Sequence, residues 1–135
     1  MAISAGFTEF ACDLFSGIGP VRVRRMFGGT GLYSGDAMFA LLYDEDTIFL
    51  RGDAALGADL EELGCRRFVY DGKSAPVAMP YWTLPEDALE DPELAADWAR
   101  RALPIAEAAA REKRAKTRVK ARPGSRAKTG RRVAN

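Results

Sequence analysis

Three arginines followed by three glycines form the stretch of this chain with the clearest capacity for chemistry. The guanidinium group of arginine binds carboxylates and phosphates through paired hydrogen bonds, and glycine lets backbone N–H groups approach an anion closely. The stretch could therefore bind an anion or contact a partner. The alternative is a solvated strand face with glycines required only by the chain geometry, since neither GxxxxGK[ST] nor GxGxxG occurs. The six residues are Arg22, Arg24, Arg25, Gly28, Gly29 and Gly31.

Catalytic chemistry of other kinds has little material in this sequence. The chain contains no histidine, which excludes Ser-His-Asp and Cys-His nucleophile pairs and imidazole metal ligands. Cys12 and Cys65 form no CxxC pair, so we expect two reduced thiols and neither a disulfide nor a metal site. The acidic residues 44–46 lack the ligand number and the central glycine of a calcium loop. We therefore expect no enzymatic activity, no metal and no cofactor.

The net charge of +1 conceals two oppositely charged parts. Residues 1–106 carry nine basic and seventeen acidic side chains, a net charge of −8, whereas residues 107–135 carry eleven basic and two acidic ones, a net charge of +9. Such a basic segment favours nucleic acid through counterion release, without sequence selectivity. It could equally be a solubilising terminus. The predicted nucleic-acid contacts are Arg111, Lys113, Arg114, Lys116, Arg118, Lys120 and Arg122.

The sequence predicts a cytoplasmic protein that does not enter a membrane. No run approaches the roughly 18 apolar residues that a membrane span needs. The first residues include no basic region and no long apolar stretch, so we expect no signal peptide.

Hydrophobic periodicity and turn residues predict the order of the elements in the first half of the chain. Residues 3–18 follow the pattern of an amphipathic helix with Ser4 as its N-cap. Four short strands separated by tight turns come next, which predicts an antiparallel meander. These strands are expected at residues 21–26, 30–34, 37–43 and 47–51.

The second half of the chain begins with a helix over residues 54–63, for which Asp53 is the expected N-cap. A strand pair follows at residues 68–70 and 77–83, and its prolines make the second member an edge strand or an irregular one.

A last helix is expected to begin at Pro92, with Asp91 as its N-cap and the proline at the first helical position. Pro104 should kink or split this helix near residues 100–103. The apolar period ends beyond Arg111, and we expect disorder from about residue 115 or 120 onward.

These elements predict an α+β fold with a single two-layer domain, in which helices pack on an antiparallel β-sheet made of the meander and the later strand pair. The domain is expected over residues 1–106, followed over residues 107–135 by a basic helical extension and a disordered tail. An open edge of this small sheet predicts a homodimer. Tyr81 and Trp82 are adjacent in a strand and point to opposite faces, so one of them is expected at a partner surface.

The stretch of arginines and glycines resembles the leading motif of the TfoX/Sxy family, in its N-terminal domain. The residues that carry the motif are Arg24, Arg25, Met26, Phe27, Gly28, Gly29 and Gly31, followed by Leu32 and Tyr33. The resemblance extends from about Phe7 to Ala102, with Thr30 where an aromatic residue is common and Arg51 where lysine is usual. Full-size members carry a second, helical C-terminal domain, and this chain has its basic tail there, so that domain is expected to be absent.

The resemblance implies a bacterial, cytoplasmic, competence-regulator-like protein that is an accessory to transcription and acts with the cyclic-AMP receptor protein. The leading functional prediction is a non-enzymatic regulatory or adaptor module that works through contacts with a protein such as a transcription factor, with nonspecific nucleic-acid affinity from the basic tail. The alternative is a small-molecule or anion-binding domain, such as a degenerate enzyme, that uses the region from Arg22 to Gly31.

Overall fold

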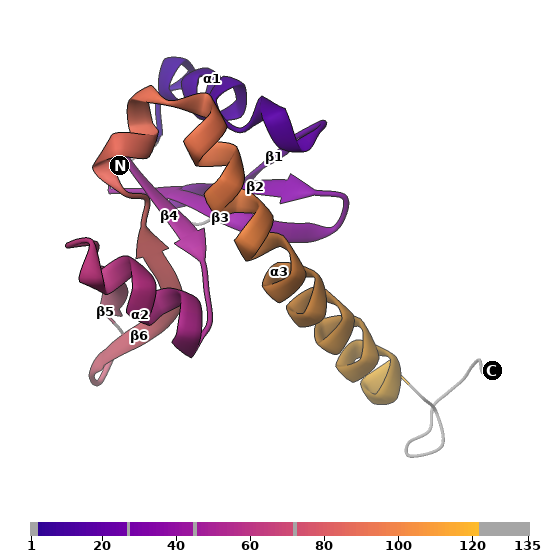
Figure 1. The fold of residues 1–135 in the computed structure, drawn as a ribbon. Helices are drawn as coiled ribbons and strands as arrows, with labels where there is room; N and C mark the ends of the chain where they lie inside the picture. The colour runs from indigo at the N-terminus through magenta and orange to yellow at the C-terminus, as the bar shows by residue number, and fades with distance from the viewer. Residues whose placement is uncertain (1–2, 27, 45, 72, 122–135) are drawn as a thin grey trace.

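The computed structural model describes residues 3–26, 28–44, 46–71 and 73–121, with the side chains of the last helix up to Thr117. Its elements form one α+β domain, as predicted, in which helices accompany a six-stranded antiparallel sheet (Figure 1). In chain order the elements are α1 (Ala5–Leu14), the 3-10 helix η1 (Ser16–Ile18), β1 (Arg22–Met26), β2 (Gly29–Ser34), β3 (Ala37–Tyr43), β4 (Thr47–Arg51), α2 (Ala54–Glu62), β5 (Arg67–Asp71), β6 (Pro76–Thr83), the 3-10 helix η2 (Glu86–Glu90) and α3 (Pro92–Ala121).

The strand order is β1-β2-β3-β4-β6-β5, and every neighbouring pair is antiparallel. The predicted meander is therefore confirmed, and its four strands agree with the predicted ranges to within a residue. β1 and β5 form the two edges of the sheet. Their outer backbone groups have no partner strand within the described part of the chain, so either edge is open to a further strand.

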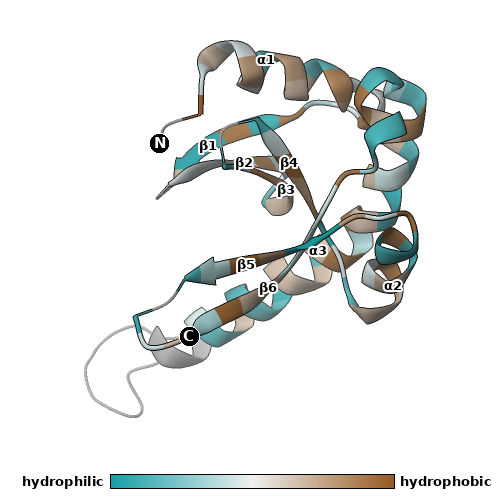
Figure 2. Ribbon diagram, turned by 90° about the vertical axis from the view of Figure 1, so that its left-hand side faces the viewer, coloured by the Kyte–Doolittle hydropathy of each residue, from teal (hydrophilic) through white to brown (hydrophobic). Residues whose placement is uncertain are grey.

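β6 was predicted to be either an edge strand or an irregular one. It lies inside the sheet and is irregular. Its pairing with β4 covers only residues 81–83, and its register with β5 shifts between Arg67 and Val69. Pro76 and Pro80 lie in the part of β6 before this short pairing with β4, where a missing backbone N–H disturbs fewer ladder hydrogen bonds. That part of β6 and β5 form a two-stranded hairpin that projects from the body (Figure 2).

The main core lies between the helices and one face of the sheet. The register between β2 and β3 shifts after Leu32, which makes Phe39 the extra residue of a β-bulge and turns it, together with Ala40, toward the helices. The Phe39 ring meets that of Phe15 edge-on, with centroids 5.3 Å apart. The largest fully buried side chains of this core are Phe15, Phe39, Leu32, Leu42, Leu50 and Leu60.

The opposite face of the sheet holds a second, smaller core because the sheet is strongly coiled. Leu41, Phe49, Phe68 and Tyr81 form this cluster. β6 separates β5 from β4, yet the ring centroid of Phe68 in β5 is 4.9 Å from those of both Phe49 and Tyr43. The sheet therefore curves around these side chains, and we call this side the concave face.

All three predicted N-caps are confirmed. The side chains of Ser4, Asp53 and Asp91 each accept a hydrogen bond from a backbone N–H of the following first turn, at 3.0, 2.9 and 3.1 Å. The first helix is shorter than predicted, since α1 ends at Leu14 and the chain continues in the separate 3-10 turn η1.

α3 runs as one helix from Pro92 to Ala121 with Pro104 inside it. Of the predicted kink or split at Pro104, the split was therefore wrong and the kink stays a prediction. The prediction of disorder from residue 115 or 120 was wrong for the residues up to Ala121. Proline lacks one backbone N–H, and the loss of a single bond does not end a helix that packing holds on both sides. Beyond the core, residues 111–121 are rich in Ala, Lys and Arg, which favour helix, and contain neither glycine nor proline. Residues 122–135 lie outside the described part of the chain.

α3 crosses the predicted boundary at Ala106 without a break. Ala106 is its last buried side chain, and residues 111–117 are all exposed. We call the segment from Arg111 to Ala121 the basic arm. It leads away from the body of the molecule (Figure 1).

Candidate functional site

The three arginines of the leading motif do not converge on one point. Alternation along β1 places Arg22 and Arg24 on the concave face, whereas Arg25 lies on the opposite face with Val23, near the start of α1. All three arginines are exposed, and none forms an ion pair with a carboxylate among the described residues. Arg22 donates a hydrogen bond to the carbonyl oxygen of Gly35 at 2.9 Å. The three arginines thus do not share one face of the sheet, and the anion or partner site at this motif stays a prediction.

The glycines of the motif have clear roles in chain geometry. Gly28 adopts φ +79°, a conformation that glycine reaches without a steric penalty. A Cβ atom on Gly29 would lie 2.5 Å from the carbonyl oxygen of Leu42, and one on Gly31 would lie 2.5 Å from the sulfur of Met38. The motif thus allows β2 to lie tightly against β3, which accounts for its glycines without a ligand.

Tyr81 and Trp82 are both buried, with 5% and 4% of their surfaces exposed. The prediction that one of them reaches a partner surface was therefore wrong. The two rings do point to opposite faces, but both faces are covered at this point of the sheet. Trp82 lies under α2 and donates its indole N–H to Glu61 at 2.8 Å, whereas Tyr81 belongs to the concave cluster.

The basic arm brings several of the predicted nucleic-acid contacts together on one helix. Arg111, Lys113, Arg114 and Lys116 are exposed. Arg114 forms an ion pair with Asp36 in the β2–β3 turn, which fastens the start of the arm to the body. Arg118 and Lys120 continue the helical backbone of the arm, while the predicted contact at Arg122 lies outside the described residues.

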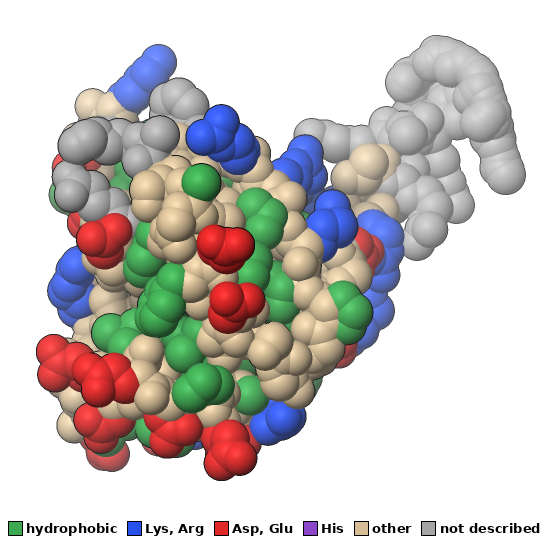
Figure 3. Space-filling view, turned by 90° about the horizontal axis from the view of Figure 1, so that it is seen from above, with side chains coloured by type: hydrophobic (Ala, Val, Ile, Leu, Met, Phe, Trp, Pro, Cys, Tyr) green, Lys and Arg blue, Asp and Glu red, His purple; other side chains and the backbone are tan. Residues whose placement is uncertain are grey.

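Charge is separated over the surface of the molecule. In the view from above, Lys and Arg side chains gather on the right, where α3 leads away, and acidic side chains gather along the lower edge (Figure 3). Hydrophobic side chains occupy the middle of this view. Phe10 of α1 is 43% exposed, and its ring stacks on that of Phe7 with centroids 5.9 Å apart. The arm is therefore the region of this surface best suited to a polyanion.

The edge strand β5 exposes apolar side chains on the projecting hairpin. Val69 and Tyr70 are 51% and 38% exposed, and Val77 of β6, which pairs with Tyr70, is also exposed. The strand begins with Arg67 and ends with Asp71. Along this free edge the strand thus carries a basic residue at one end, an acidic residue at the other, and two aromatic residues on either side of Val69.

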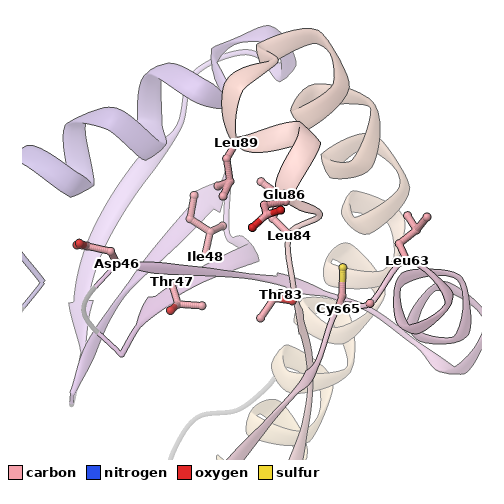
Figure 4. A pocket seen from close by; sticks show the side chains of 10 residues that line it. Asp46, Thr47, Ile48, Leu63, Cys65, Thr83, Leu84, Glu86 and Leu89 are labelled. Atoms are coloured by element: carbon pink, nitrogen blue, oxygen red, sulfur yellow. The ribbon is translucent and has the colours of Figure 1, made fainter.

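A pocket of about 360 Å³ lies between β4, the end of β6, η2 and the end of α2 (Figure 4). The sulfur of Cys65 points into it, beside Thr83 and Glu86. Burial raises the pKa of the Cys65 thiol, although a hydrogen bond with Thr83 opposes that rise. Burial also raises the pKa of Cys12, with Asp13 and Glu9 adding to the rise. Both thiols are free, as predicted, and their raised pKa values disfavour the nucleophilic thiolate.

A smaller recess of about 190 Å³ lies between α3 and the concave face. Arg51, the last residue of β4, contributes its side chain there, beside Tyr81 and Lys113. In the sequence, Arg51 stands out only as a departure from the family pattern. Alternation after Phe49 and Leu50 was the signal that could have placed it with Phe49 on the concave side.

The model of the TfoX N-terminal domain family matches residues 13–106 of this sequence. The chain belongs to this family. The matched region ends where the buried part of α3 ends, so the basic arm lies outside the TfoX N-terminal domain proper. The resemblance seen in the arginine and glycine motif is thereby confirmed.

A curated relative of this TfoX-family chain is the DNA transformation protein TfoX1 of Aliivibrio fischeri. The two are 39% identical over 69 residues, which is 51% of this chain and 32% of the relative. The chain therefore matches about a third of the length of that protein. In the described part of this family member no helix is long and apolar enough to cross a membrane, and no three Cys, Asp or Glu side chains are grouped as metal ligands.

Proposed function

We propose that this chain is a non-enzymatic, cytoplasmic regulatory module that works as a homodimer, contacts a protein partner of the transcription machinery and holds nucleic acid through its basic arm. The observation that carries the proposal is the arm itself, a helix of exposed basic side chains that continues beyond an acidic body. The kinship with a DNA transformation protein supports a role near DNA.

The arm suits the phosphate backbone better than it suits base edges. Its described basic side chains lie on different sides of one helix, because Arg111 and Arg114 are separated from Lys113 and Lys116 by more than a quarter turn. Lysine and arginine on a helix attract phosphates along the backbone without reading sequence. The net charge of the body is negative, so the remainder of the surface should repel DNA and leave the arm as the point of contact.

The test is fluorescence anisotropy of a labelled DNA duplex with the full chain and with a chain that ends at Arg111, at about 50 and 200 mM salt. We expect tail-dependent binding that weakens steeply with salt. Replacing Lys113 and Lys116 with glutamine should reduce the salt slope by about 2, since each phosphate contact contributes about 0.9. Lys73→Gln, a change on the body, is the matched control. Equal binding by the truncated chain, or no binding at low salt, would refute the role of the arm.

The homodimer is proposed to form through the edge strand β5. In a two-fold antiparallel pairing of β5 strands centred on Val69, Arg67 of one copy faces Asp71 of the other, and Phe68 faces Tyr70. The strand is thus self-complementary in charge and in aromatic character, as an interface between identical surfaces requires. Opposite-charge and aromatic cross-strand pairs each contribute about 0.2–1 kcal/mol.

The other edge of the sheet is poorly suited to the same role. β1 carries Arg22, Arg24 and Arg25 and no acidic residue, so two copies paired along this strand would bring like charges together. A dimer through β5 would also place two basic arms in one particle, and two linked binding sites raise the apparent affinity for DNA.

Charge reversal tests the β5 interface. Arg67→Asp and Asp71→Arg should each weaken the dimer in sedimentation equilibrium because they oppose like charges, and the double variant should restore it because the charges are again opposite. Arg67 also donates a hydrogen bond to the carbonyl oxygen of Met79 at 2.8 Å. Arg67→Asp and the double variant both lose that bond, so the comparison between these two isolates the effect of the charge pair. Arg24→Asp on β1 is the control and should leave the dimer intact. A double variant no better than the single ones, or a monomeric wild type, would refute the interface.

A further inference from the structure

Arg51 is an unusual residue for the end of an apolar strand. It pairs with Tyr81 across the β4–β6 ladder, and its guanidinium carbon lies 5.6 Å from the centre of the Tyr81 ring. The side chain is half-buried, and its Nε is buried without a hydrogen-bond partner among the described residues. A buried donor without an acceptor is unfavourable, and such groups are rare in folded proteins. An acceptor brought by a ligand would satisfy it.

The recess around Arg51 is large enough for a small organic molecule. Its volume is about 190 Å³, and an engineered apolar cavity of about 150 Å³ in another protein binds benzene. Met26 and Met38 from the concave face, with Ala106, Ala109 and Ala110 from α3, supply its apolar wall. One side of the recess is therefore apolar, and on the other side Arg51 supplies a hydrogen-bond donor.

The charged and polar groups at the recess favour a single negative charge. Arg51 and Lys113 supply two positive charges. Asp36 lies at the rim but is paired with Arg114. Burial raises the pKa of Tyr81, while the Arg51 guanidinium opposes that rise, so the phenol keeps its proton at neutral pH and can donate a hydrogen bond. The planar fork of arginine matches a carboxylate, and the nearby Asp36 disfavours a phosphate dianion.

We propose that the recess between α3 and the concave face is a binding site for a small carboxylate with a short apolar or aromatic body, held at its charged end by Arg51 and Lys113. The apolar body would lie against the methionines of the sheet and the alanines of α3. Because the site includes Lys113 at the base of the basic arm, bound carboxylate would tie the arm to the sheet. The site shares Lys113 with the proposed contacts with DNA and is separate from the β5 interface.

Two measurements on the full chain test the site, with benzoate and butyrate as probes and with benzamide, butyramide and inorganic phosphate as comparisons. Titration calorimetry measures affinity, and nitrogen–proton NMR spectra of the arginine Nε–H groups identify the residue. We expect one arginine Nε–H signal to shift with either carboxylate at millimolar concentration and not with the neutral amides. That signal should be missing from the spectrum of Arg51→Gln.

Matched variants separate the site from general charge effects. Arg51→Gln and Arg51→Lys should each weaken benzoate binding at least tenfold, whereas Arg24→Gln, an exposed arginine on the same sheet face outside the recess, should not. Lys113→Gln should weaken binding, and Lys116→Gln, about one helical turn further along, should not. If Arg51→Gln fails to fold, the affinity of Arg51→Lys for benzoate and the NMR shifts of the wild-type protein decide whether Arg51 binds the carboxylate. Absence of any Nε–H shift, equal binding by Arg51→Lys, or tighter binding of phosphate than of benzoate would overturn the proposal.

Discussion

The contact between α2 and Trp82 allows a sharp test of how this domain is packed. Gly57 lies in the interior of α2, and a Cβ atom there would lie 2.3 Å from Cζ2 and 2.5 Å from Cε2 of Trp82. The indole cannot easily move aside. Its N–H is bonded to Glu61 at 2.8 Å, and a Cβ on Gly52 would lie only 3.0 Å from the same ring. Gly57→Ala must therefore displace either the helix or the ring.

Two opposing effects decide the size of the change. Alanine is favoured over glycine in a helix by about 1 kcal/mol, whereas overpacking of a well-filled core costs about 1–3 kcal/mol. The steric overlap of a Cβ atom on Gly57 with Trp82 is severe, so overpacking should outweigh helix propensity. We expect a net loss of about 1–2 kcal/mol in the free energy of unfolding. For a domain of this size, that corresponds to a fall of about 4–16 °C in Tm.

Gly6→Ala is the matched control for this experiment. Gly6 lies in the first turn of α1, and nothing is within 4 Å of the Cβ position. The same chemical change should therefore stabilise the protein slightly, by about 0.5 kcal/mol. Urea unfolding followed by circular dichroism and by tryptophan fluorescence measures both variants. If Gly57→Ala stabilised the protein as much as Gly6→Ala, that result would refute the close contact between Trp82 and Gly57 of α2.

Three further predictions concern single side chains. Gly29→Ala would place Cβ 2.5 Å from the backbone carbonyl oxygen of Leu42, which cannot rotate away, so urea unfolding should show a loss of about 2–3 kcal/mol; near-wild-type stability would contradict the tight β2–β3 approach. Asp53→Ala removes the acceptor of the Leu56 N–H and should cost about 1 kcal/mol in the same assay. Burial raises the pKa of Tyr81, so the unfolded chain loses this phenol proton first and the free energy of unfolding falls as pH rises above about 10. Tyr81→Phe should show a smaller fall in urea titrations across that range, and an equally steep fall would refute burial of the phenol.

Local features of the sequence were sufficient to predict most of the elements. The N-caps Ser4, Asp53 and Asp91 depend on hydrogen bonds within a few residues, and all three are confirmed. The meander follows from alternating apolar residues and tight turns, which act over similarly short distances. The family motif also lies within one short stretch, so it could be recognised without knowledge of the fold.

Features that depend on distant segments could be decided only by the tertiary structure. Alternation correctly set Tyr81 and Trp82 on opposite faces, but their burial depends on α2 and on the coiling of the sheet, which come from elsewhere in the chain. Arg25 and Arg24 are neighbours in sequence, yet strand geometry sends them to opposite faces. Arg51 and Lys113 are 62 positions apart in the sequence, and both line one recess because α3 packs beside this part of the sheet. The sequence thus determined the elements and the charge of the basic arm through short-range hydrogen bonds, periodicity and composition, whereas the recess around Arg51 arose from long-range packing, which no local pattern encodes.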